Sequence, residues 1–186
     1  MAARAPRHVT AVAFALLATL LATALGGCSG TPRVSTPGGD DDGILAEIGV
    51  SDVDDGEVHT IMVAEVCLRD SSGGTVTAVV PDPGSGLEVR RFTVGQPADP
   101  SNGVGGAEGT LDENGLGAIA HDVLAVCDED PPDQVHVEVT RTSPAAYSAQ
   151  LTLDFVADGQ RGELTNHVSL TMCAPDATEP RCASDG

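Results

Sequence analysis

The sequence has no lysine and no tryptophan, and only one tyrosine and three phenylalanines among its 186 residues. A core without large aromatic side chains has to be built from Val, Leu, Ile and Ala, and such a composition favours β-strands. Scarce aromatics also argue against a surface that binds partners through aromatic anchors. The length is that of a single folded domain of ordinary size.

Basic side chains are scarce as well. All 28 acidic residues follow position 28, where they face only seven arginines, so the chain from residue 28 onward carries a formal charge of −21. Nucleic-acid phosphates repel such a chain, and the sequence holds no basic patch that would reverse the repulsion. We therefore expect no nucleic-acid partner.

The first 30 residues are organised like an export signal. Arg4 and Arg7 precede an apolar run at residues 11–25, and small residues follow it. The segment LGGC, Leu25 to Cys28, resembles the lipobox of bacterial lipoproteins, which has a leucine three positions before the cysteine and small residues between them. The resemblance implies cleavage before Cys28 and attachment of lipid, as diacylglyceryl and palmitate groups, to this residue. The abundance of Ala, Gly, Val and Asp is consistent with a high-GC bacterium.

The resemblance covers about 30 residues, and it implies a location rather than an activity. Residues 1–27 are then a signal peptide, and the mature protein is lipid-anchored on the extracytoplasmic face of the cell membrane. Two alternatives stay open: a soluble secreted protein cut nearby, and an uncleaved membrane anchor. A spanning helix needs about 20 apolar residues, and the glycines and proline that follow residue 25 shorten the helical part below that length.

Residues 28–56 are rich in Gly, Ser, Thr, Pro and Asp, and this composition predicts a flexible acidic linker with a span of roughly 25 to 30 Å. Within it, residues 44–50 (ILAEIGV) form either one helical turn or an edge strand. Two acidic clusters, Asp40 to Asp42 and Asp52 to Glu57, raise the possibility of calcium binding. In the second cluster Gly56 falls at the fifth position, whereas an EF-hand loop needs glycine at the sixth. A solvated linker is the favoured interpretation, and we expect neither a metal nor another cofactor.

From residue 57 to 174, short apolar runs alternate with turn formers, a pattern typical of an antiparallel β-sandwich. We expect an all-β, immunoglobulin-like sandwich of about seven strands, at residues 57–70, 75–80, 87–94, 119–127, 134–141, 147–157 and 163–173. The clearest prediction is a hairpin closed by residues 158–162. Residues 175–186 read as a polar tail.

Removing Cys28 from the count leaves four cysteines, Cys67, Cys127, Cys173 and Cys182, an even number that suits an oxidising compartment. Four cysteines permit three pairings. We expect one bridge inside the sandwich and a second that holds the tail. The spacing of two close cysteines, repeated, that zinc sites use is absent.

The sequence shows no catalytic motif of the kinds that carry a nucleophile and a base. Its histidines beyond the signal are His59, His121, His136 and His167, and we expect His136 and His167 to be solvated on the polar faces of strands. The favoured hypothesis is a non-catalytic binding or structural module with an envelope protein or a cell-wall component as partner. The alternative is an enzyme or small-ligand-binding protein whose site is assembled from dispersed residues.

Overall fold

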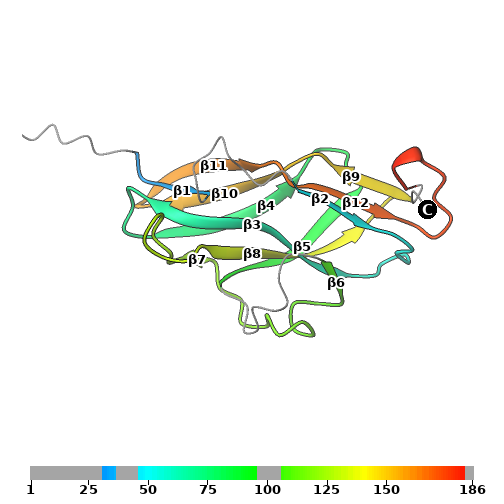
Figure 1. The fold of residues 1–186 in the computed structure, drawn as a ribbon, viewed down its shortest axis with the longest axis horizontal. Coiled ribbons are helices and arrows are strands. Elements are labelled where there is room, and N and C mark those ends of the chain that lie inside the picture. The colour runs from blue at the N-terminus through cyan, green and yellow to red at the C-terminus, as the bar shows by residue number, and fades with distance from the viewer. Residues whose placement is uncertain (1–30, 37–45, 96–105, 183–186) are drawn as a thin grey trace, which may run out of the picture. The chain divides into compact units, whose positions relative to one another are not determined.

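The computed structural model describes residues 31–36, 46–95 and 106–182 (Figure 1). The chain divides into two units, residues 1–30 and 31–186, and the described residues all belong to the second. The predicted signal peptide, Cys28 and the cluster Asp40 to Asp42 lie outside them. Among the described residues, no helix is long and apolar enough to cross a membrane.

The described residues form twelve strands and one 3-10 helix. In chain order these are β1 Arg33–Ser35, β2 Glu47–Val50, β3 His59–Arg69, β4 Gly74–Pro81, β5 Leu87–Gly95, β6 Gly106–Glu108, β7 Asp122–Val123, β8 Asp133–Arg141, β9 Ala145–Ser148, β10 Leu151–Ala157, β11 Gln160–Asn166, β12 Ser169–Cys173 and the helix η1 Pro180–Cys182. The protein is therefore all-β, as the sequence predicts.

The strands make three sheets (Figure 1). The first has the order β1-β3-β8-β5, with β6 also paired to β3; the second has the order β11-β10-β4-β7; the third has the order β2-β12-β9. Every pair of strands in these sheets is antiparallel except β12 with β2. Buried apolar side chains from all three sheets form one core cluster, made mainly of Val and Leu.

Three expected strands differ from the structure. The run at residues 119–127 is a strand only at β7, and the runs at residues 147–157 and 163–173 each divide into two strands of different sheets. The first division is fixed by hydrogen bonds: the Ser148 hydroxyl donates to the Gln150 carbonyl at 2.6 Å, and the Ala149 N–H donates to the Asp82 carboxylate at 2.8 Å. These bonds hold a turn that carries the chain from the third sheet to the second.

Two strands lie where the sequence predicts a flexible linker, so this prediction is wrong for the residues concerned. Strand β1 pairs with the end of β3, and Val34 at its centre is 2% exposed. Strand β2 pairs with β12, which confirms the edge-strand alternative for residues 47–50. Val34 and Val53 are buried in the core, and this burial offsets part of the conformational entropy that the ordered segments lose.

The hairpin of β10 and β11 is confirmed, although its loop is shorter than predicted. Ala157 pairs with Gln160, so only Asp158 and Gly159 lie between the strands. Both have positive φ, 47° and 80°, as a type I′ turn requires. The Asp158 carboxylate accepts hydrogen bonds from the N–H and hydroxyl of Ser72, which ties this turn to the β3–β4 connection.

Candidate functional site

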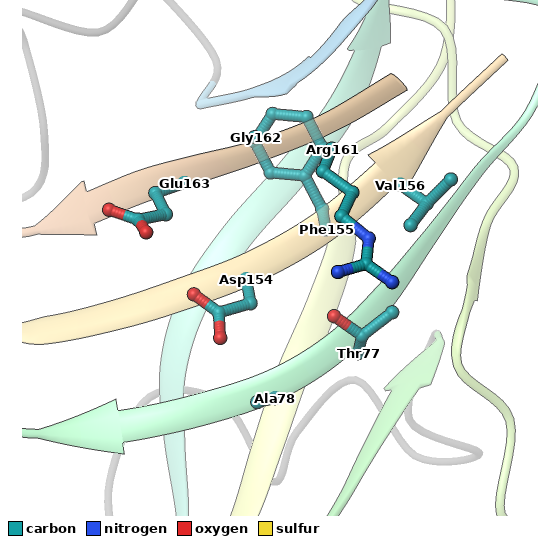
Figure 2. A pocket seen from close by; sticks show the side chains of 8 residues that line it. All are labelled: Thr77, Ala78, Asp154, Phe155, Val156, Arg161, Gly162 and Glu163. Carbon is teal, nitrogen blue, oxygen red and sulfur yellow. The ribbon is translucent and has the colours of Figure 1, made fainter. Parts of the chain in front are cut away.

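A hollow with a volume of about 660 Å³ lies on the outward side of three neighbouring strands, β4, β10 and β11 (Figure 2). We call it the β4–β10–β11 groove. Its lining residues are Thr77, Ala78, Asp154, Phe155, Val156, Arg161, Gly162 and Glu163. Thr77, Arg161 and Glu163 are solvent-exposed, so the groove opens to water.

The hollow follows from local backbone irregularity and small side chains. Asp154 pairs with Ala78 and Phe155 with Val76, so Thr77 is the extra residue of a β-bulge on β4. Ala78, which pairs with Asp154, adds little side-chain volume to the surface. Beneath Gly162 lies the ring of Phe155, whose Cε2 atom would be 2.8 Å from a Cβ added at this glycine.

The charges of the groove are arranged across the strands. Asp154 on β10 lies directly opposite Glu163 on β11, and like charges in this position repel each other. Figure 2 shows both carboxylates on one side of the groove, while Arg161 extends from β11 toward Thr77. Among the described residues, the structure records no ion pair of Arg161, Asp154 or Glu163. All three groups are therefore available to a ligand.

The sequence alone does not predict this groove. Alternation along β10 places Asp154 on the polar face. The predicted loop at residues 158–162 includes Arg161, however, and with this loop the strand residue that pairs with Glu163 is not defined. The signal was present in the dipeptide Asp158-Gly159, which is typical of a two-residue turn. Closing the hairpin there places Glu163 opposite Asp154.

The four histidines are dispersed. His59 is buried and lies 2.7 Å from a carboxylate oxygen of Glu57, whereas the ring of His121 stacks on Phe92 with centroids 4.3 Å apart. His167 is exposed, as expected, and lines a second hollow of about 270 Å³ that shares Phe155 and Glu163 with the groove.

The expectation for His136 is wrong, because this side chain is only 5% exposed. The segment that follows β6 lies over this face of the sheet: the Leu111 N–H donates to Glu138, and the hydroxyl of Thr93, the β5 partner of His136, donates to the Ala118 carbonyl. Glu138 and Thr140 are buried on the same face. Burial lowers the pKa of His136. Its ring nitrogen lies 3.3 Å from the amide oxygen of Gln134. Among the described residues, no hydroxyl or thiol is hydrogen-bonded to an imidazole.

The acidic cluster from Asp52 to Glu57 is an ordered turn rather than a solvated linker. Asp55 forms an ion pair of 2.7 Å with Arg141, and the Arg141 Nε donates to the Val53 carbonyl at 2.8 Å. The Asp54 N–H donates to Glu57 at 2.7 Å, and this bond lowers the pKa of Glu57. The carboxylates of Asp55 and Glu57 are thus engaged in contacts within the protein. In the described part of the chain, no group of three or more His, Cys, Asp or Glu residues could hold a metal ion.

The four cysteines form the two expected bridges. Cys67 on β3 pairs with Cys127, and Cys173 at the end of β12 pairs with Cys182 in η1, so the first bridge lies beside the core and the second holds the tail. The tail is held further by Arg181, whose guanidinium lies 4.0 Å from the centre of the Tyr147 ring. Two disulfides indicate an extracytoplasmic, oxidising location.

Comparison of the chain with protein-family models, with curated proteins and with solved structures finds no match.

Proposed function

We propose that the chain is a lipid-anchored extracytoplasmic protein whose immunoglobulin-like β-sandwich binds an envelope partner and catalyses no reaction. The observation that carries this proposal is the β4–β10–β11 groove, in which three charged side chains face solvent with no ion-pair partner among the described residues. An open sheet face of this kind suits contact with another chain, whereas enzymes enclose their substrates in deeper clefts. The common core of the larger sheets supports the sandwich architecture.

The anchor is supported by the cysteine count. Cys67, Cys127, Cys173 and Cys182 are consumed in two disulfides, so Cys28 is the one cysteine of the chain left for another use. It stands at the lipid-accepting position of a segment that resembles a lipobox. Each buried methylene of an acyl chain contributes about 0.8 kcal/mol, and two chains are enough for stable attachment.

The chemistry of the groove favours a basic, extended segment of an envelope protein as partner. A lysine or arginine placed between Asp154 and Glu163 would relieve their mutual repulsion. Arg161, at the other side, can donate to a main-chain carbonyl or a carboxylate of the same segment. The formal charge of −21 from residue 28 onward would attract such a segment over longer distances.

Site-specific crosslinking in intact cells tests the proposal. A photoreactive amino acid at Thr77, in the groove, is compared with the same amino acid at the exposed Glu88 on β5, in another sheet. We expect a protein adduct from position 77 alone, and we expect it to be lost when Asp154→Asn and Glu163→Gln are introduced together. An adduct that survives both substitutions, or that forms equally from position 88, contradicts the groove as the contact surface.

A further inference from the structure

Few residues separate Cys28, the proposed lipid-accepting residue, from the first strand of the folded domain. Strand β1 begins at Arg33, five residues after Cys28, and an extended chain spans at most about 3.5 Å per residue. The first strand therefore starts within roughly 17 Å of Cys28. The linker predicted from composition would allow a longer and more variable separation.

The position of β1 in the sheet decides which part of the domain comes near Cys28. Arg33 pairs with Arg69, and Val34 pairs with Leu68, at the last residues of β3. His59, at the start of the same strand, is ten residues from Arg69 and thus about 33 Å away. The chain consequently enters the domain at one end of its strands.

We call this end the β1 end, and Figure 1 shows it opposite the end that carries η1. The β1 end includes the loop at residues 124–130. The Leu68 N–H donates to the Ala125 carbonyl at 2.7 Å, and the Cys127 N–H donates to the Leu68 carbonyl at 3.0 Å. Leu124 in this loop is 76% exposed. The opposite end holds the Cys173–Cys182 bridge.

We propose that β1 holds the domain directly on the membrane, with the β1 end toward the lipid and the η1 end away from it. This orientation rests on the proposed lipidation of Cys28. Leu124 is the apolar side chain that reaches the lipid interface. The charges beside it oppose deeper insertion, because exposed acids at this end outnumber its arginines, Arg33 and Arg69; these acids are Asp70, Asp122, Asp128, Glu129, Asp130 and Asp158.

The orientation also specifies the partner of the β4–β10–β11 groove. Arg161 is the second residue after the β10–β11 turn and Glu163 is the fourth, so the groove is within about 13 Å of the β1 end. A groove this near the lipid is reached by a chain segment that itself lies beside the membrane. The partner is therefore a basic juxtamembrane segment of an integral envelope protein.

Vesicles of phosphatidylcholine that contain a maleimide lipid test the orientation. The mature chain, residues 28–186, is coupled to them through the Cys28 thiol, since the other four cysteines are in disulfides. A fluorescent amino acid replaces either Leu124 or the exposed Thr178, and energy transfer to an acceptor on the lipid headgroups is measured. We expect severalfold stronger transfer from position 124 than from position 178. Equal transfer from the two positions would overturn the proposal.

A longer spacer provides the matched control. Twenty residues of Gly and Ser inserted between Gly30 and Thr31 should reduce the difference between positions 124 and 178, because the domain then rotates freely over the surface. A difference that persists unchanged with the spacer means that β1 does not set the orientation. Chemical coupling bypasses lipidation in the cell, so failure of the orientation is distinguishable from failure of the lipid anchor.

Discussion

The ring of Phe155 on β10 lies across Gly162, its directly opposite partner on β11. The absence of a side chain at Gly162 is what makes room for the ring, which is the largest apolar side chain that the second sheet contributes to the core. Arg161 and Glu163, on either side of Gly162 in β11, are exposed and line the outward surface, so the missing side chain belongs to the inward face of the strand. Gly162 thus serves the packing of the core directly beneath the candidate site.

Gly162→Ala should lower the free energy of unfolding by about 1 to 3 kcal/mol, because the added methyl group collides with the Phe155 ring and overpacks the site. Urea unfolding of the purified domain measures the change. Gly73→Ala is the matched control, since nothing lies within 4 Å of a Cβ at that position. Equal stability of the two variants would show that the ring does not occupy the space beside Gly162.

Removing the two disulfides should have unequal effects. The Cys67–Cys127 bridge spans 60 residues and the Cys173–Cys182 bridge spans 9. Chain-entropy reasoning then gives losses of about 4 and about 2.5 kcal/mol when each pair is replaced by serine. Thermal unfolding of the two double variants checks the order, and a larger loss from the second pair would contradict it.

We expect the Glu138 side chain to hold the segment that follows β6 against the first sheet. Its buried carboxylate accepts from the Leu111 N–H at 2.9 Å and lies 3.2 Å from the Arg91 guanidinium. Glu138→Leu leaves that buried N–H without its acceptor, at a cost of about 1 to 3 kcal/mol. Asp112→Asn removes the exposed partner of the same arginine, and we expect a loss below about 0.5 kcal/mol. Urea unfolding compares the variants, and similar losses would refute the buried contact.

The burial of His136 predicts that the free energy of unfolding depends on pH. Burial lowers its pKa below the ordinary value of about 6.5. As the pH falls below that value, the unfolded chain takes up the proton before the folded one, so stability is complete above about pH 6.5 and declines toward the lower folded pKa. The carboxylate of Glu57, whose pKa is also lowered, loses its contribution only at more acidic pH.

The measurement is the free energy of unfolding at pH 7.5 and at pH 5.5. His136→Gln should flatten the decline between these values, whereas His167→Gln, at an exposed position, should leave it unchanged. If the His136 variant keeps the full slope, another group is responsible.

The sequence predicts the strands that are single apolar runs bounded by turn formers, and it predicts less well where tertiary contacts divide a run. Strands β3, β4, β5 and β8 match the expected runs, and the even cysteine count anticipates the number of bridges, although it leaves their pairing open. The division between β9 and β10 depends on Asp82, which is distant in sequence, so local periodicity carries no sign of it. His136 is buried because the segment that follows β6 covers its face of the sheet, and the alternation along β8 carries no sign of that contact.

The mass and location of the protein made in cells test the lipid anchor most directly. We predict that the mature chain begins at Cys28, carries the mass of a diacylglyceryl group, and is found in the membrane fraction. Cys28→Ser should move the protein to the soluble or secreted fraction. An unmodified chain that keeps residues 1–27 and stays in the membrane with the serine variant would contradict the account.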